Sequence, residues 1–400
     1  MGALDGIRVL SFNHFLSGPA AAQHLGDLGA DVVAVEPLTG AFQRNWAVGN
    51  RFVDGISVNH MTTGRNKRSI AVDLKSPEGV AAVKRLVAGA DVVMENFRPG
   101  TLEKLGLGED VLRAINPGLV YAATTGFGPD GPYAKRPGQD ILLQAMTGLA
   151  AHTGSMEHGP VAVGSVPIDH HAAALTVAGI LAALLERGRT GKGRRVEVNM
   201  LQAAIDLQGE SVTAWLNGAE HAGPRGQQGM ANWFSPGPYG IYACTDGHVM
   251  ISMSTPSQIG KALDLDAIVG FSDKDGFDRR GEVSSAVAGA MARMAMDEAL
   301  PKLEAAGVWH EVVRDYDSLR GNPQLVHLGG LVDTETRDGS PMTLISSPIR
   351  MDGAAADLRL PPQALGAQTR EVLAEAGYSA TEIDALLESG AVAQTDRMSV

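Results

Sequence analysis

The stretch VPIDHH at residues 166–171 contains the carboxylate best placed for chemistry in this sequence. Asp169 follows a short apolar run and precedes an Ala- and Leu-rich segment that predicts a helix to about Arg187. Asp is a favoured helix N-cap, so capping is the plain structural role of Asp169. A catalytic role is compatible with capping, because a helix N-terminus keeps a carboxylate ionised. An ionised carboxylate is a competent nucleophile toward an activated carbonyl.

His170 and His171 follow Asp169 directly and are the nearest candidate metal ligands. Adjacent residues on a helix point in different directions, so the two rings are poorly arranged to hold one ion. No carboxylate–histidine pair at four-residue spacing accompanies them, and zinc ligation is therefore weakly supported. We predict no metal site and treat both histidines as ordinary buried or surface residues.

A second group of candidate residues is basic. Three members precede a predicted strand at 69–74, one ends that strand, and two follow a predicted strand at 91–96. Each alone could be a solvated loop charge, but basic side chains gathered at the carboxyl ends of strands could bind phosphates. The residues are Arg65, Lys67, Arg68, Lys75, Arg98 and Lys104.

Strands and helices alternate regularly in the first part of the chain. The predicted strands cover 7–12, 31–36, 69–74, 91–96 and 119–128, and the predicted helices cover 17–30, 77–88 and 108–115. This alternation predicts an α/β fold with a doubly wound parallel sheet. Ligands of such sheets bind at the carboxyl ends of strands, so we expect Asn96, Phe97 and residues 125–128 near a cleft.

The rest of the chain predicts further elements and a domain division. We expect a strand over 194–199, a single helix over 200–216, a hairpin over 241–253 and two helices within 368–390. Composition becomes loop-rich after residue 221. The predicted division is a large domain over 1–221, a small domain over 222–325 and a return to the large domain over 326–400.

Composition and charge exclude several classes of protein. The 400 residues are 44% hydrophobic and 20% charged, which is typical of a globular protein. A net charge of −12 without a strongly basic block argues against nucleic-acid binding. The single cysteine, Cys244, excludes an internal disulfide framework, and neither a signal peptide nor a membrane span is evident. We therefore expect a cytoplasmic protein with no membrane partner.

The first predicted strand–helix–strand unit invites a dinucleotide-binding interpretation, in which Glu36 would hold a ribose. The loop before the helix has only Gly18, followed by Pro19, and lacks G-x-G-x-x-G. Its backbone therefore cannot approach a pyrophosphate in the usual way. Packing explains Gly18 and Glu36 adequately, and we predict no nicotinamide or flavin cofactor.

Eight segments of the sequence resemble the class III coenzyme A transferases, the CaiB/BaiF family, which includes formyl-CoA transferase and carnitine CoA-transferase. The α-methylacyl-CoA racemases are relatives of this family. Each segment alone is weak, but their order and spacing over nearly the whole chain are specific. The segments are LDGIRVLSF, SGPAAAQHLGDLGADVVAVE, GRNKRSIAVDLK, ENFRPGTLEKLG, TGFGPDGPY, PGQDILLQAMTG, GILAALLERGRTGKGRRVEVNM and PYGIYACTDGHVMIS.

The resemblance implies a fold and a reaction. The fold is a large Rossmann-like domain built from both chain ends plus a smaller α+β domain, in an interlocked homodimer. The reaction moves coenzyme A from an acyl-CoA to a carboxylic acid, with coenzyme A as a substrate and no tightly bound cofactor. It passes through an aspartyl anhydride and an aspartyl-CoA thioester.

The resemblance also implies roles for individual residues. Asp169 matches the nucleophile, Asp140 an auxiliary acid, and Gln139 a neighbour of the reaction centre. The positions that match coenzyme A contacts are Leu16, Ser17, Lys75, Asn96, Phe97, Arg98 and Lys104.

Two alternatives to a transferase remain. Racemases of this group share the aspartate at position 169 but add a histidine in a Gly-His-Asp tripeptide, which here reads Gly138-Gln139-Asp140. A glutamine amide does not titrate near neutrality and cannot act as a general base, so the sequence favours a transferase. A non-catalytic protein that binds coenzyme A thioesters is the second alternative, and the intact Asp169 argues against it.

Overall fold

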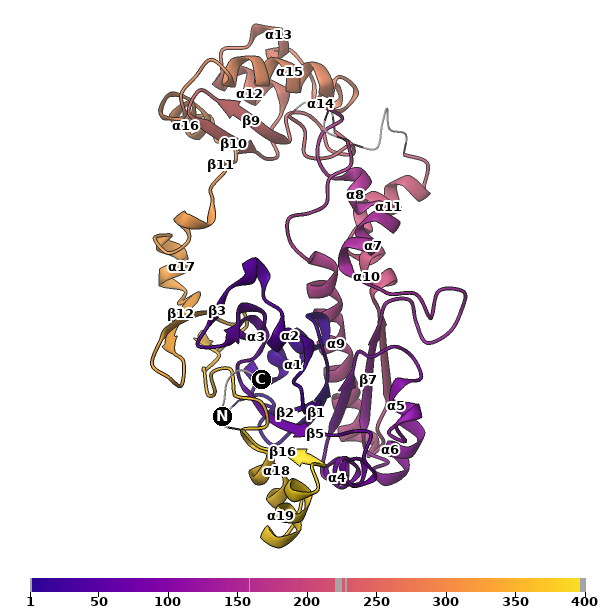
Figure 1. Cartoon of the computed structure of the whole chain (residues 1–400). Helices are drawn as coiled ribbons and strands as arrows, with labels where there is room; N and C mark the ends of the chain where they lie inside the picture. The colour runs from indigo at the N-terminus through magenta and orange to yellow at the C-terminus, as the bar shows by residue number, and fades with distance from the viewer. Residues whose placement is uncertain (1, 158, 220–224, 227–228, 396–400) are drawn as a thin grey trace. The chain divides into compact units, whose positions relative to one another are not determined.

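The structure is a computed structural model (Figure 1), and it describes residues 2–157, 159–219, 225–226 and 229–395. Within these residues the chain forms two compact units. The first unit consists of residues 2–140, 167–203 and 320–395, so it draws on both ends of the described chain. The second unit consists of residues 141–166 and the described part of 204–319. The predicted domain limit at 221 and 222 lies outside the described residues, and the three-part domain division stays a prediction.

A mostly parallel sheet forms the centre of the first unit (Figure 1). In the described residues its strand order is β16-β5-β2-β1-β6-β7-β8, and β16 alone runs antiparallel to its neighbour. The carboxyl ends of the six parallel strands therefore meet at one edge, which confirms the predicted α/β class. The strands are β1 (Arg8–Phe12), β2 (Asp31–Glu36), β5 (Lys67–Val72), β6 (Val92–Glu95), β7 (Val120–Thr125), β8 (Arg195–Asn199) and β16 (Val392–Ala393).

Helices cover both faces of this sheet. Successive strand residues point to opposite faces, so each strand contributes to two apolar cores. Leu10 and Phe12 of β1 are buried with side chains of α4, α6, α18 and α19. Val9 is buried on the other face with side chains of α1 and α9. The helices are α1 (Ser17–Asp27), α4 (Pro77–Val87), α6 (Glu109–Ile115), α9 (Pro167–Thr190), α18 (Thr369–Glu375) and α19 (Ala380–Glu388).

Helix α9 is the one helix in the described part of the chain that is long and apolar enough to cross a membrane. Its side chains Ala173, Val177 and Ile180 are buried against α1 and the sheet. Burial in a shared core explains the apolar composition of this face of the helix. We therefore assign α9 to the core of the first unit.

The helix predicted over residues 200–216 is interrupted, so that prediction is wrong. Two residues separate helix α10 (Met200–Asp206) from α11 (Gly209–Leu216). The N–H of Gln208 bonds the carbonyl of Ile205 in a tighter turn, and the Gln208 side chain donates to the carbonyl of Ala204 at 2.8 Å. Gly209 follows directly, and glycine weakens a helix interior.

The second unit has its own sheet and core. In the described residues its three strands have the order β11-β10-β9 and are antiparallel. Cys244 pairs with Gly247, which confirms the predicted hairpin and leaves residues 245 and 246 as its turn. The elements are α8 (Leu149–His152), β9 (Gly240–Cys244), β10 (Gly247–Ile251), α12 (Pro256–Ala262), α13 (Asp266–Val269), α14 (Asp273–Asp278), α15 (Arg280–Met291), α16 (Met296–Ala305) and β11 (His310–Val312).

Shorter elements complete the first unit. Ile56 and Met61 form a small core with Met342 and Leu344. The elements are α2 (Phe42–Asn45), β3 (Phe52–Val53), β4 (Ile56–Ser57), α3 (Val58–Thr63), α5 (Thr101–Lys104), α17 (Pro323–His327), β12 (Leu331–Glu335), β13 (Pro341–Ile345), β14 (Arg350–Met351) and β15 (Ala354–Ala355).

Candidate active site

Asp169 is the third residue of α9, which begins at Pro167. The prediction that Asp169 is the N-cap of this helix is therefore wrong. Asp140, the first residue of α7 (Asp140–Met146), takes that role. Its Oδ2 accepts the backbone N–H of Ile168 at 2.7 Å and that of Asp169 at 3.0 Å. A carboxylate from another segment thus satisfies N–H groups that the first turn of a helix leaves without partners.

The carboxyl group of Asp169 lies in an environment that opposes its ionisation. Burial, and after it the negative charge of Asp140, raise the pKa of Asp169 to about 7, although a hydrogen bond from the backbone N–H of Ser17 acts in the opposite direction. Burial therefore opposes the ionisation expected of a carboxylate at a helix N-terminus. Asp140 already accepts two of the N–H groups of this first turn. Residue 169 is only half-buried, so a substrate can reach it.

Two residues predicted to contact coenzyme A hold the loop that follows β1. The Oδ1 of Asn96 accepts the N–H of His14 at 2.9 Å, and its Nδ2 donates to the carbonyl of His14 at 2.8 Å. The ring centroid of Phe97 lies 5.1 Å from that of His14. Asn96 and Phe97 therefore lie beside the loop that leads to Ser17.

The first turn of α1 is fixed from two sides. A Cβ added to Gly18 would lie 2.3 Å from Oδ1 of Asn13, so any larger residue there would displace the buried Asn13 side chain. Lys67 is buried, and its Nζ donates to the carbonyl of Pro19 at 2.8 Å. These contacts explain Gly18 by packing, and they hold the buried Ser17 at the start of the helix.

Two glycines hold the segment that carries Gln139 and Asp140 against the end of β7. A Cβ at Gly138 would lie 2.3 Å from Cα of Gly126, and a Cβ at Gly126 would lie 2.6 Å from Cα of Gly138. Backbones in such close contact require glycine on both sides. Gln139 is exposed beside this contact, whereas Asp140 is 4% exposed.

Three of the six basic candidates lie at the carboxyl edge of the sheet. Lys75 follows β5, Arg98 follows β6, and Lys104 ends α5; all three are exposed. The half-buried Leu16 and the buried Ser17 follow β1 at the same edge. The structure therefore brings the residues with predicted coenzyme A contacts to one side of the first unit.

The other three basic candidates serve internal contacts at the amino end of β5, so the prediction that they lie at a carboxyl end is wrong. Arg65 forms an ion pair with Asp27 at 2.6 Å, and Arg68 forms one with Asp31 at 2.6 Å. Lys67 donates to the carbonyl of Pro19 in α1. All three charged groups therefore have partners within the fold.

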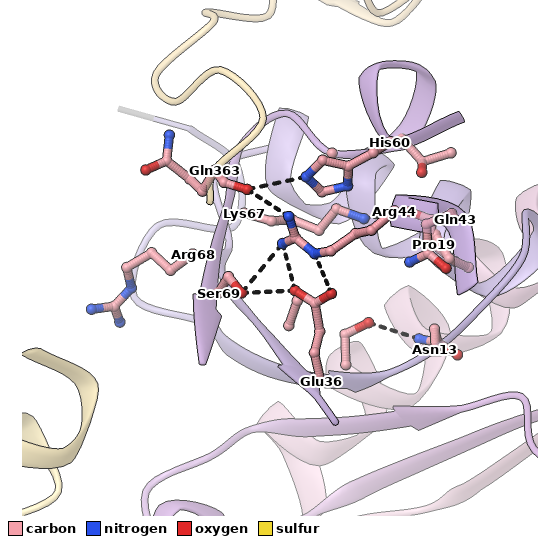
Figure 2. Close-up of a pocket in the computed structure, with 14 residues that line it drawn as sticks. Asn13, Pro19, Glu36, Gln43, Arg44, His60, Lys67, Arg68, Ser69 and Gln363 are labelled. Carbon is pink, nitrogen blue, oxygen red and sulfur yellow. Dashed lines mark hydrogen bonds and ion pairs between the residues drawn. The ribbon is translucent and has the colours of Figure 1, made fainter. Parts of the chain in front are cut away.

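Glu36, the candidate ribose ligand, belongs to a buried polar cluster (Figure 2). Its carboxylate accepts from Arg44 Nε at 2.6 Å and Nη2 at 2.7 Å, and from the Ser69 hydroxyl at 2.7 Å. Although burial opposes it, the charge of Arg44 lowers the pKa of Glu36 to about 2. His60, in the same cluster, and Arg44 both contact the carbonyl of Gln363. The cluster lines a cavity of about 20 Å³, which is room for one water molecule and not for a ribose.

Sequence reasoning named Asp140 and Lys67 but missed the contacts through which they hold the site together. Asp140 reaches Ile168 over 28 residues, and Lys67 reaches Pro19 over 48. Such contacts leave no local pattern, because capping preferences are recognised from adjacent residues. The glycine directly before Gln139 and Asp140 was the one available signal of a close backbone approach.

The fold and the site define an α/β enzyme with a carboxylate at the carboxyl edge of its parallel sheet. The sequence model of the family described as "CoA-transferase family III" matches residues 4–369 of this chain. The chain therefore belongs to this family. It is a class III CoA-transferase, an enzyme family whose substrates are coenzyme A thioesters, as its relatives also indicate. The family resemblance seen in the sequence is thereby confirmed.

Individual relatives agree with this assignment. The chain is 31% identical to a succinyl-CoA:glutarate CoA-transferase of Mus musculus, with 98% of this chain and 91% of that protein covered. It is 40% identical to a succinyl-CoA–D-citramalate CoA-transferase of Chloroflexus aurantiacus over 61% of this chain and 60% of that protein. A crystal structure of a CaiB/BaiF family protein from Brucella suis is similar with a TM-score of 0.81 and 30% identity, covering 94% and 99% of the two chains.

Proposed function

We propose that this enzyme moves coenzyme A from an acyl-CoA donor to a carboxylic acid acceptor, with Asp169 as the nucleophile. The observation that carries this proposal is the position of the Asp169 carboxyl group. It is half-buried, it accepts the N–H of Ser17, and it lies in the first turn of a core helix. A carboxylate in such a place can attack a thioester that enters from the carboxyl edge of the sheet.

The reaction consists of four acyl transfers. A carboxylate oxygen of Asp169 attacks the thioester carbonyl of the donor, the C–S bond breaks, and a mixed anhydride and coenzyme A thiolate result. The thiolate attacks the Asp169 carbonyl, which releases the donor acid and leaves an aspartyl-CoA thioester. The acceptor carboxylate then attacks that thioester to give a second anhydride and the thiolate. The thiolate finally attacks the acceptor carbonyl, which releases the new acyl-CoA and restores Asp169.

The environment of Asp169 suits this sequence of steps. Burial makes the charged carboxylate costly relative to any neutral form. The anhydride and the thioester are both uncharged at this side chain, so the penalty that raises its pKa also favours acylation. A pKa of about 7 leaves a substantial ionised fraction at neutral pH, and this fraction is the nucleophile.

We propose that the exposed cations at the carboxyl edge bind the phosphates of coenzyme A. Lys75, Arg98 and Lys104 are the residues concerned, because exposed ammonium and guanidinium groups suit phosphate oxygens. Leu16 and Ser17 would border the pantetheine arm near Asp169. Asn96 and Phe97 would contribute mainly by holding the loop at His14.

The relatives suggest the class of acid. One acts on succinyl-CoA and glutarate and another on succinyl-CoA and D-citramalate, as their names state. We propose dicarboxylates as donor and acceptor for this enzyme also. The interlocked homodimer and the cytoplasmic location belong to the same proposal.

Trapping of the acylated enzyme tests the nucleophile. The enzyme is mixed with succinyl-CoA without acceptor, quenched with hydroxylamine and digested for mass spectrometry. We expect a hydroxamate at Asp169 in the wild type and none in Asp169→Asn. Coenzyme A exchange that continues in Asp169→Asn, or that proceeds in the wild type without a label at Asp169, overturns the assignment.

A further inference from the structure

We propose that Asp140 is a positioning residue of the transfer reaction: it aims Asp169 by binding the backbone of the first turn of α9, and its negative charge favours the acylated forms of Asp169. The inference rests on the proposed role of Asp169 and adds a second acid to the working site. Asp140 does not need to touch the substrate for this role. It acts through the N–H groups of Ile168 and Asp169, at 2.7 and 3.0 Å.

The position of Asp140 is itself rigidly determined. Its side chain is buried, at 4% exposure. Two residues before it, Gly138 lies in backbone contact with Gly126 at the end of β7. The contact between Gly126 and Gly138 therefore links the end of β7 to Asp140, and through Asp140 to the first turn of α9. Movement of Asp140 would change the direction in which Asp169 points.

As a helix cap, Asp140 brings an electrostatic repulsion that an uncharged cap would not. Asparagine and serine cap a helix about as well as aspartate, and neither carries a charge. Here the charge of Asp140 faces a second carboxyl group, that of Asp169, and opposes its ionisation. A purely structural cap would avoid this repulsion. An aspartate at this position indicates that the repulsion has a use.

That use follows from the charges of the intermediates. Acylation of Asp169 removes its negative charge and so removes the repulsion by Asp140. The groups that face Asp169 are Asp140 from α7 and the N–H of Ser17 from α1, while His24 of α1 faces the next residue, His170. Asp140 is thus the charged side chain that favours the neutral anhydride and thioester over the free carboxylate.

The substitution Asp140→Asn separates this role from a merely structural one, because it keeps an acceptor oxygen and removes the charge. The measurement is the pH dependence of kcat/KM for coenzyme A exchange between succinyl-CoA and a dicarboxylate. We expect the acidic limb, set by ionisation of Asp169, to move to lower pH by about one unit. The plateau above it falls several-fold, because Asp169 becomes a weaker nucleophile. Asp140→Ser, a second neutral cap, should behave in the same way and guards against a folding defect of either variant.

Asp130→Asn is the matched control, since it removes one negative charge from an exposed position of the same loop. Its profile should coincide with that of the wild type. An unchanged profile in both Asp140 variants, or a uniform loss of rate with no displacement of the acidic limb, overturns the inference. Hydroxylamine labelling of the wild type at Asp169 is run alongside. Absence of that label counts against the nucleophile itself, so the two failures are distinguishable.

Discussion

Asn96 and His14 are joined by two hydrogen bonds, one to the N–H and one to the carbonyl of the same residue. This pair ties the loop after β6 to the loop after β1, and these two strands are neighbours in the sheet. Asn96 lies in one loop, and Leu16 and Ser17 lie in the other. One side-chain amide therefore sets the spacing between two parts of the proposed coenzyme A site.

Removal of this amide should weaken substrate binding more than chemistry. In Asn96→Ala both bonds to His14 are lost, at about 1 kcal/mol each, so KM for the acyl-CoA should rise about tenfold or more. We expect kcat to fall less. Steady-state kinetics measures the changes in KM and kcat separately. Asn96→Asp keeps the acceptor but not the donor, so its KM should lie between those of the wild type and Asn96→Ala. An unchanged KM in Asn96→Ala would show that the loop holds its place without the two bonds to His14.

The phosphate role of the edge cations predicts a dependence on salt and on substrate. Lys75→Ala, Arg98→Ala and Lys104→Ala should each raise KM for acyl-CoA severalfold at low ionic strength, and the effect should shrink as salt is added. With an acyl-pantetheine thioester, which lacks the phosphates of the nucleotide, the variants should match the wild type. Lys192→Ala serves as the control, because Lys192 is exposed near the amino end of β8. Equal losses with both thioesters would contradict a phosphate contact.

The raised pKa of Asp169 predicts a pH-dependent cost to stability. The Asp169 carboxyl group binds its proton more tightly in the folded state than in the unfolded state. Its protonation therefore contributes to stability fully below the ordinary pKa of 3.8, and this contribution is lost as pH rises through about 7. Asp169→Asn should remove this dependence and make the protein about 2–4 kcal/mol more stable than the wild type at pH 8. Near pH 4 the wild type and Asp169→Asn should have similar free energies of unfolding. Denaturant unfolding at both pH values tests this, and a stability difference that does not change with pH would count against it.

The glycine contact between β7 and the Asp140 segment predicts a strong steric effect. Gly138→Ala would put a Cβ 2.3 Å from Cα of Gly126, so the two backbones must separate. We expect a loss of about 1–3 kcal/mol of stability together with a large loss of activity. Gly188→Ala in α9 is the control, because its Cβ meets nothing within 4 Å and alanine favours helix. Thermal unfolding and turnover are measured on both variants, and wild-type activity in Gly138→Ala would refute the close approach.

The buried pair of Glu36 and Arg44 predicts a stability effect without a role in cofactor binding. Glu36→Gln leaves Arg44 buried without its counter-charge and should cost about 3–5 kcal/mol at pH 7. Because the folded pKa of Glu36 is lowered to about 2, its contribution is present above its ordinary pKa of 4.5 and is lost as pH falls toward 2. The difference in free energy of unfolding between the wild type and Glu36→Gln, measured with denaturant, should therefore become smaller at low pH.

Glu186→Gln is the control for that measurement, because Glu186 pairs with the exposed Arg194 at 2.5 Å. A surface pair of this kind contributes little, and no measurable change is expected. A Glu36→Gln variant as stable as the Glu186 variant would show that the buried pair is dispensable.

The elements of the first unit could be predicted from sequence where the signal is local. Ser76 caps α4 through the N–H of Gly79, with Pro77 in the first turn, and all of this is written in adjacent residues. The short apolar run of β1 likewise indicates a strand whose two faces are buried. The break before Gly209 has only a weak sign in the sequence, a single glycine in an otherwise periodic segment, because the tight turn at Gln208 depends on contacts that form only in the folded chain.

The candidate site could be proposed from the sequence residue by residue, but its arrangement could not. The position of Asp169 before an apolar helix makes it a candidate, whereas the cap of that helix comes from Asp140, far away in the sequence. Arg65 and Arg68 could not be separated from Lys75 by residue type alone. Arg65 and Arg68 differ from Lys75 in pairing with the carboxylates of Asp27 and Asp31. These carboxylates come close to the two arginines only when the sheet has formed.

The edge of the sheet at β5 has a consequence for how the protein is made. β16 pairs with Ala71 and Val72 at that edge, and Arg68 at the start of β5 meets Glu375 across 307 residues. While the chain emerges from the ribosome, β5 is complete long before the segment that shields it has been synthesised. An uncovered strand edge recruits other strands, so the nascent polypeptide passes through a long aggregation-prone interval. Early termination before residue 369 would make that interval permanent.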